Sequence, residues 1–219
     1  MYSVADLYDR FKDRLGLELV AGKSGLKRKI KVPEAHRPGL SLSGYLKNFV
    51  NKRILIFGRV EIEYLRDLLP IVRVTRLQSL LSTATPAVIV ARRYLPPKEL
   101  KEICEKNNIP LFRANLTTMN LMSKLTLLLV EEFSPTISCH GTLVEVFGVG
   151  VLIKGDSAVG KSETALGLVE RGHRLISDDI VKVKKREAGY LEGFGAELTK
   201  HHMEIRGIGI INVAHLYGA

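Results

Sequence analysis

The segment GDSAVGKS, residues 155–162, matches the phosphate-loop pattern G-x-x-x-x-G-K-[ST]. Glycines at two positions let the backbone curve so that its N–H groups point at phosphate oxygens. In such loops the lysine reaches the outer phosphates of a nucleotide and the hydroxyl residue ligates Mg²⁺. We therefore expect a nucleotide-binding segment made of Gly155, Asp156, Ser157, Ala158, Val159, Gly160, Lys161 and Ser162.

An acidic pair, Asp178 and Asp179, follows Lys161 by only 17 residues and ends the apolar stretch Leu175–Ile176. We expect this pair at the end of a strand, where an acidic side chain can hold Mg²⁺. The second carboxylate, beside a like charge, can take a proton from an acceptor hydroxyl. A solvated turn is the alternative, and the spacing alone does not assign the two roles.

Two further positions can carry chemistry. His140 stands at the start of a β-rich segment and is either a catalytic residue or an ordinary residue at the end of a strand. Glu204 and Arg206 lie two residues apart in MEIRGIGIIN, residues 203–212, which we expect to be a strand, so their side chains project from the same side. Such a pair can place a metal ligand beside a cation for phosphate, or form a salt bridge at a strand edge.

The elements around the loop satisfy the requirement of strand, glycine-rich turn and helix. Segments 141–148 and 148–155 are β-rich and flanked by glycines, which predicts a hairpin around Gly148 and Gly150. Residues 162–172 predict a helix after the loop. Residues 173–185 predict a single strand that returns through the acidic pair.

Upstream, strands alternate with helices, which predicts an α/β layer domain. The expected helices span 4–15, 61–69, 96–108 and 117–133, and the expected strands span 53–58, 86–92 and 109–114. We also expect 17–22 and 30–32 to pair as a hairpin around the basic turn 23–29. SPTIS, residues 134–138, has the composition of a linker, so we predict two domains, 1–134 and 135–219.

The chain of 219 residues has a net charge of +10, and residues 1–134 hold the whole excess, with 23 Lys+Arg against 13 Asp+Glu. This basic part can attract an anionic partner or simply be solvated, but no nucleic-acid-binding pattern accompanies it, so we do not expect nucleic acid.

We find neither a signal-peptide pattern nor an apolar run long enough for a bilayer. Cys104 and Cys139 fit a reduced cytoplasm, and the adjacent His201 and His202 do not predict zinc.

The stretch CHGTLVEVFGVGVLIKGDSAVGKSETALGLVERGHRLISDDIV, followed by MEIRGIGIINV, resembles the bacterial HPr kinase/phosphorylase family. HRPGLSLSGYL and RILIFG extend the likeness to the family's N-terminal regulatory domain. The resemblance implies a catalytic domain similar to the nucleotide-binding core of phosphoenolpyruvate carboxykinase. It also implies a cytoplasmic homohexamer that phosphorylates a serine of HPr, a carrier of the sugar phosphotransferase system, with Mg²⁺ and ATP or pyrophosphate. The reverse reaction uses inorganic phosphate and yields pyrophosphate, and the two activities together control carbon catabolite repression.

Carried over by position, the resemblance implies that His140 and Lys161 are catalytic and that Asp179 exchanges the proton in both directions. It implies Mg²⁺ ligation by Ser162 and Glu204, with Asp178 supporting the metal. Family members continue beyond the position of Ala219, so we expect further active-site elements there. Two other functions use the same loop: a small-molecule phosphotransferase, and a nucleotide-sensing regulatory protein with a basic N-terminal part.

Overall fold

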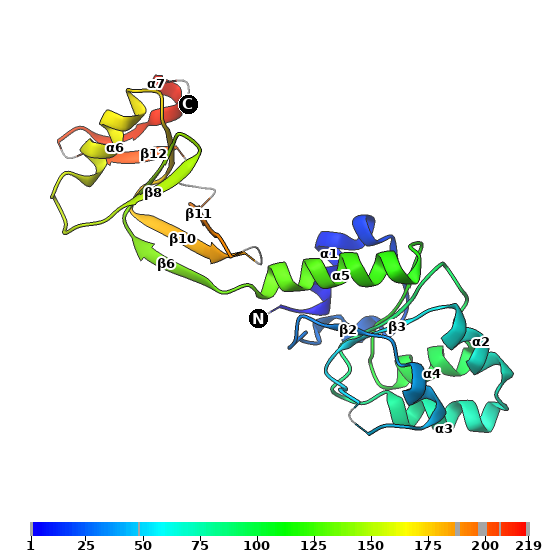
Figure 1. Ribbon diagram of the computed structural model, residues 1–219. Coiled ribbons are helices and arrows are strands. Elements are labelled where there is room, and N and C mark those ends of the chain that lie inside the picture. Colours follow the sequence, from blue (N-terminus) through cyan, green and yellow to red (C-terminus); the bar gives the residue numbers. More distant parts are fainter. Residues whose placement is uncertain (1, 48, 187–188, 197–200, 206, 218–219) are drawn as a thin grey trace. The chain divides into compact units, whose positions relative to one another are not determined.

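The computed structural model describes residues 2–47, 49–186, 189–196, 201–205 and 207–217. The chain forms two compact units, Met1–Phe133 and Ser134–Ala219 (Figure 1). Both units combine helices with strands, which confirms the expected mixed α/β class.

The first unit is built on a five-stranded sheet with the order β1-β5-β4-β3-β2. Its strands are β1 (Leu17–Ala21), β2 (Ala35–His36), β3 (Ile54–Phe57), β4 (Val88–Val90) and β5 (Leu111–Ala114). Neighbouring strands from β2 to β5 run parallel, whereas β1 runs antiparallel to β5. β3 and β4 contain only buried apolar residues, as expected for parallel strands covered on both faces.

Helices cover both faces of this sheet. The helical elements are α1 (Val4–Leu15), α2 (Arg59–Asp67), α3 (Pro70–Leu80), α4 (Lys98–Lys106) and α5 (Thr118–Phe133), with 3-10 helices η1 (Lys23–Lys27) and η2 (Gly39–Ser43). α1 and α5 pack on the core that contains Ile54 and Ile56, and α2, α3 and α4 pack on the core that contains Leu55 and Phe57. Successive residues of β3 therefore feed opposite cores, as the alternation of a strand requires.

One local expectation for this part of the chain is wrong, and two elements were not predicted. Residues 17–22 do not form a hairpin with 30–32, because β1 pairs with the distant β5 and most of the basic turn folds as η1. The helix α3, with Pro70 in its first turn, was not expected. Residues 136–138 of the predicted linker 134–138 belong to β6 (Thr136–His140), which pairs with β10 (Ile180–Lys185).

The second unit contains two three-stranded sheets, β11-β10-β6 and β8-β7-β9, and a β12-β13 pair. The remaining strands are β7 (Thr142–Val146), β8 (Val149–Ile153), β9 (Arg174–Ser177), β10 (Ile180–Lys185), β11 (Leu191–Phe194), β12 (His202–Ile205) and β13 (Gly209–Asn212). β7 and β8 form the hairpin that the sequence predicts. Its two turn residues, Phe147 and Gly148, have φ values of 49° and 80°, the positive values typical of tight two-residue hairpins.

A third core joins the elements around the candidate site. It contains residues of β7, β9 and β12 together with α6 (Lys161–Val169) and α7 (Val213–Tyr217).

The structure corrects two strand predictions for the second unit. Residues 173–185 form two strands in different sheets, separated at Asp178 and Asp179, and residues 203–212 form the hairpin β12–β13. In both segments a positive φ, at Asp179 and at Gly207, turns the backbone away from a continuous strand.

Candidate active site

The glycine-rich loop connects β8 to α6, so the strand, turn and helix expected around it are all present. Ala158 and Gly160 have φ values of 63° and 96°, which curve the loop backbone. Lys161 Nζ donates hydrogen bonds to the carbonyl oxygens of Gly155 at 3.1 Å and Asp156 at 2.7 Å. The ammonium group therefore lies against the loop's own backbone.

The N-terminus of α6 opens onto the same loop. Gly160 is the N-cap residue and supplies no side-chain cap. The first intrahelical hydrogen bond runs from Thr164 N to Gly160 O at 2.9 Å. The N–H groups of the first helical turn precede this bond, and a helix N-terminus of this kind favours bound anions.

Asp178, which directly follows β9, contacts residues of three elements of the second unit. Its Oδ1 accepts a 2.7 Å hydrogen bond from Thr142 Oγ1 on β7. Ser162 Oγ, at the start of α6, lies 3.4 Å from Oδ1 and 3.3 Å from Oδ2. Glu204 N, on β12, donates to Oδ2 at 3.3 Å. Three residues expected at the metal, Ser162, Asp178 and Glu204, are thus brought together.

The Glu204 side chain lies on the exposed side of β12. Its neighbours Met203 and Ile205 are buried in the third core, so strand alternation sends Glu204 outward. The contact with Asp178 is made by the backbone of Glu204. Arg206, the expected companion of Glu204, lies outside the described residues.

Asp179 and His140 form a second pair beside Asp178. His140 Nδ1 lies 3.5 Å from Asp179 Oδ1, and the two side chains are 84% and 80% exposed. The pairing of β6 with β10 sets this contact, because His140 is in register with Ile180. Gly141 N also donates to Asp179 O at 3.0 Å, which ties the two segments together.

The backbone at Asp179 has an uncommon conformation. Ile180 N donates to Asp178 O at 3.0 Å, which closes a turn with Asp179 as its central residue. The φ of Asp179 is 69°, the sign found in the rarer and more strained form of the γ-turn. Such conformations concentrate at functional sites, where the surrounding structure holds them in place.

The oxygen ligands at Asp178 fit a hard divalent cation. Mg²⁺ prefers oxygen donors and commonly takes one or two carboxylates, with water and substrate phosphates completing its octahedron. Ser162 and Asp178 supply a hydroxyl and a carboxylate next to the loop, and Glu204 contacts Asp178 through its backbone N. Within the described residues no three His, Cys, Asp or Glu side chains form a ready-made metal cluster, so such a cation would also need ligands from water or phosphate.

Sequence reasoning missed two positioning residues, Thr142 and Ser177, which are 1% and 2% exposed. Thr142 fixes Asp178, and Ser177 Oγ donates to Ile180 O at 2.8 Å across the aspartate turn. Both are polar residues in largely apolar strands, and that contrast is the signal that could have identified them. Among the described residues no hydrogen bond or ion pair joins Lys161 to either aspartate.

Comparisons with known proteins match both halves of the chain to a protein-serine kinase. Residues 2–129 match the model described as "HPr Serine kinase N terminus", and residues 131–219 match "HPr Serine kinase C-terminal domain". The chain therefore belongs to the HPr kinase/phosphorylase family, which confirms the resemblance drawn from the sequence. The expectation of an enzyme of the protein-serine kinase/phosphorylase class is confirmed with it.

Relatives named "HPr kinase/phosphorylase" match nearly the whole chain. The protein from Halalkalibacterium halodurans is 42% identical over 214 residues, which are 98% of this chain and 68% of the relative. The Bacillus licheniformis protein is 44% identical with the same coverage, and the Bacillus subtilis protein is 42% identical over 94% of this chain and 67% of its own length.

A solved structure, the HPr(Ser) kinase/phosphatase from Coxiella burnetii, is 36% identical over 37% of this chain and 54% of its own, with a TM-score of 0.36.

Within the described part of the chain, no helix combines the length and apolar character needed to cross a bilayer.

Proposed function

We propose that this chain is a bifunctional enzyme that phosphorylates a serine of HPr and removes that phosphate by phosphorolysis. Membership of the family makes HPr the expected substrate, and the names of the relatives carry both activities. The observation that carries the proposal is the convergence of Ser162, Asp178 and Glu204 beside the glycine-rich loop, with Asp179 and His140 adjacent.

The loop 155–162 would hold the phosphates of ATP or pyrophosphate through its N–H groups and the N-terminus of α6. Lys161 would exchange its contacts with Gly155 O and Asp156 O for phosphate oxygens and stabilise negative charge as the phosphoryl group moves. Ser162, Asp178 and Glu204 would hold Mg²⁺. When bound, Mg²⁺ supplies charge neutralisation on the donor phosphates.

In the kinase direction, the hydroxyl oxygen of the HPr serine attacks the terminal phosphorus of the donor. Asp179 accepts the hydroxyl proton, and ADP leaves, or inorganic phosphate when pyrophosphate is the donor. In the reverse direction an oxygen of inorganic phosphate attacks the phosphoserine phosphorus and forms pyrophosphate. The serine oxygen leaves and takes back the proton from Asp179, as microscopic reversibility requires.

His140 would orient the carboxylate of Asp179, because its Nδ1 lies 3.5 Å from Asp179 Oδ1. Both side chains are largely exposed, so a protein substrate can reach them without rearrangement of a buried core. In this proposal His140 would also lie near the incoming serine. We therefore propose catalytic roles for three residues, His140, Lys161 and Asp179.

We further propose the biological setting that goes with this activity. The unit 1–133 would be regulatory, and the unit 134–219 would be the phosphate-loop catalytic domain, similar to the nucleotide-binding core of phosphoenolpyruvate carboxykinase. The enzyme would act in the cytoplasm as a homohexamer and serve carbon catabolite repression. Sedimentation of the purified protein tests the hexamer, because a monomer at micromolar concentration contradicts it.

The decisive experiment incubates the intact gene product with purified HPr, Mg²⁺ and ATP and locates the phosphate by mass spectrometry. We expect one phosphoserine on HPr. Addition of inorganic phosphate without ATP should then regenerate unmodified HPr and release pyrophosphate. The proposal is wrong if HPr stays unmodified. In that case the protein would either transfer the phosphate to a small molecule or bind ATP without transferring its phosphate.

A further inference from the structure

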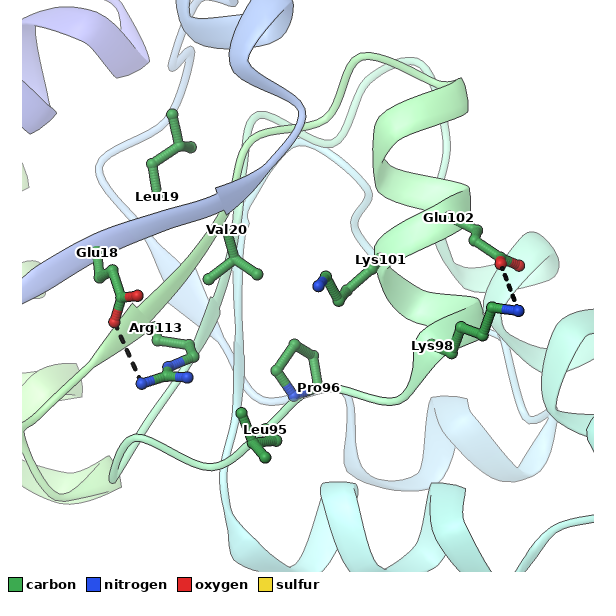
Figure 2. A pocket seen from close by; sticks show the side chains of 9 residues that line it. All are labelled: Glu18, Leu19, Val20, Leu95, Pro96, Lys98, Lys101, Glu102 and Arg113. Carbon is green, nitrogen blue, oxygen red and sulfur yellow. Dashed lines mark ion pairs between the residues drawn. The ribbon is translucent and has the colours of Figure 1, made fainter.

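The first unit contains a cavity of about 750 Å³ between α4 and the β1–β5 edge of the sheet (Figure 2). Its volume lies in the range of small-molecule sites, which is about 300–1,000 Å³. Val20, Leu95 and Pro96 supply apolar surface, and charged side chains surround it. The cavity lies wholly within residues 18–113 and shares no residue with the candidate active site.

Arg113 on β5 places a charged side chain in the wall of the cavity. It is the only partly exposed residue of β5, and it lies two residues after Leu111, so both project toward the core of α2, α3 and α4. Arg113 is in register with Glu18 on β1, and the two side chains form an ion pair at 3.2 Å. A charged pair thus stands where an apolar residue would have extended the core.

The positive charges of the cavity are only partly neutralised. Lys98 pairs with Glu102 at 3.4 Å on the outer turn of α4, and Arg113 pairs with Glu18. Among the described residues the ammonium group of Lys101 has no ion-pair or hydrogen-bond partner, although its backbone N–H donates to Pro97 O. Figure 2 shows its ammonium group directed toward the middle of the cavity, between Val20 and Pro96.

Arg113 has donor capacity beyond its pair with Glu18. Its Nε is shielded from solvent and has no hydrogen-bond acceptor in the part of the chain that the structure describes. Buried donors are almost always hydrogen-bonded, so an unused one calls for a water, an ion or a ligand group nearby. Arg113 therefore keeps one unused donor next to the cavity wall, in addition to the ammonium group of Lys101.

We propose that this cavity binds a small organic anion, with its carboxylate or phosphate at Lys101 and its apolar body against Val20, Leu95 and Pro96. The three cations and two carboxylates of the wall leave one net positive charge for the ligand. Burial of the apolar body and a charge-assisted hydrogen bond would contribute together. An inorganic ion has no apolar body to bury, and a neutral apolar compound cannot form the charge-assisted hydrogen bond.

The test uses the intact protein, isotope-labelled for NMR, with four probes: phenyl phosphate, benzoate, inorganic phosphate and benzyl alcohol. We expect phenyl phosphate or benzoate to shift amide signals of residues 18–20, 95–102 and 113 in a saturable manner. Whichever of the two binds more tightly identifies the anionic group. Inorganic phosphate and benzyl alcohol should bind these residues at least about tenfold more weakly.

Variants separate this site from the phosphate loop. Lys101→Met keeps the side-chain stem and should weaken binding about tenfold, whereas Lys106→Met, on the same helix but outside the cavity, should leave it unchanged. Lys161→Met should also leave it unchanged. The proposal is overturned if the shifts are confined to residues 155–162, if Lys101→Met binds as well as the unaltered chain, if benzyl alcohol matches the anions, or if no probe binds at millimolar concentration.

Discussion

Thr142 donates a 2.7 Å hydrogen bond to Oδ1 of Asp178, and this bond gives the two adjacent aspartates different environments. Asp178 is also within hydrogen-bond distance of Ser162 Oγ and of the backbone N of Glu204. Within the described parts of the chain only His140 pairs with the carboxylate of Asp179, and the Asp179 side chain is 80% exposed. A fixed carboxylate suits metal ligation and an accessible one suits proton exchange, so the geometry supports different roles for the two residues.

Thr142→Val tests whether that hydrogen bond positions Asp178. The methyl group that replaces the hydroxyl keeps the shape but removes the donor, so the carboxylate loses its strongest contact. We expect the Mg²⁺ concentration for half-maximal phosphorylation of HPr to rise about tenfold or more, the effect usual for residues that orient metal ligands. The maximal rate at saturating Mg²⁺ should change much less.

Thr142→Ser is the matched control, because it restores the hydroxyl and removes only a methyl group from a side chain that is 1% exposed. Its Mg²⁺ requirement should stay near that of the unaltered protein. Equal Mg²⁺ requirements in Thr142→Val and Thr142→Ser would show that the bond serves folding and not metal binding.

The two aspartate-to-asparagine variants should fail in different ways. Asp179→Asn removes the proton acceptor, so both directions should slow by about 10²–10⁴-fold at saturating Mg²⁺ while ATP still binds. Asp178→Asn should instead raise the Mg²⁺ requirement. Rates measured with HPr, together with ATP titration calorimetry, distinguish the two patterns. An Asp179→Asn enzyme of nearly normal rate would contradict the proposed proton transfer.

Lys161→Ala should abolish phosphorylation and phosphorolysis, because it removes the cation expected to stabilise the moving phosphoryl group. The fold should survive, since among the described residues Lys161 Nζ hydrogen-bonds only to two exposed carbonyl oxygens of its own loop. Lys185→Ala, at the end of β10, is a charge-matched control in the same unit. Its activity should be unchanged, and a comparable loss there would show that net charge, not position, matters.

A stability prediction concerns the ion pair between Arg73 on α3 and Glu99 on α4, whose side chains are 15% and 17% exposed. Arg73 also donates to the carbonyl oxygens of three residues at the C-terminal end of α2, Leu65, Arg66 and Leu68. Arg73→Met leaves these acceptors without that donor and should lower the free energy of unfolding by about 2–3 kcal/mol. Urea denaturation measures the difference.

The control is Arg59→Met, because the pair of Arg59 with Glu63 is exposed, at 68% and 51%. Its loss should change the free energy of unfolding by at most about 1 kcal/mol. A similar cost for both variants would mean that the contacts of Arg73 contribute no more than a surface pair.

The ion pair between Arg73 and Glu99 also predicts how the stability of the fold depends on pH. Glu99 accepts a hydrogen bond from its own backbone N–H and others from Arg73, and these hold the pKa of its carboxyl below the ordinary value. A carboxyl with a lowered folded-state pKa stabilises the fold above its unfolded pKa of about 4.3, and this stabilisation is lost as the pH falls through the folded pKa. Between pH 6 and pH 3 the Glu99→Gln variant should therefore lose less stability than the unaltered protein. Parallel pH curves for the two would contradict the linkage.

Local signals in the sequence were sufficient for many elements of the fold. The helix 4–15 was predicted, and it ends at Gly16, whose φ of 60° is typical of a glycine that terminates a helix. The β7–β8 hairpin and the strand, loop and helix around Lys161 were also predicted. In each case neighbouring residues determine the structure, because the turn chemistry and the apolar period lie within a short stretch of chain.

Pairing between distant segments could not be read from the sequence in the same way. β1 has the composition of a hairpin strand, but its partner is β5, roughly ninety residues away, and the burial of Leu17 and Phe112 in one core fixes this choice. The break at Asp179 depends on the pairing of β6 with β10, which again joins distant residues. Thr142 became a candidate only when that topology placed it beside Asp178.

The last prediction concerns the two cysteines. Cys104 is fully buried in the core of α2, α3 and α4, and burial raises the pKa of its thiol to about 12. The thiolate is the reactive form, so Cys104 should resist alkylation in the folded protein at neutral pH. Cys139 is only partly buried, on β6 next to His140, and should react first. Brief treatment with iodoacetamide and peptide mass spectrometry should therefore find the label on Cys139 alone, and on both residues after denaturation in urea. Early labelling of Cys104 in the folded protein would show that the core of the first unit opens far more often than its packing implies.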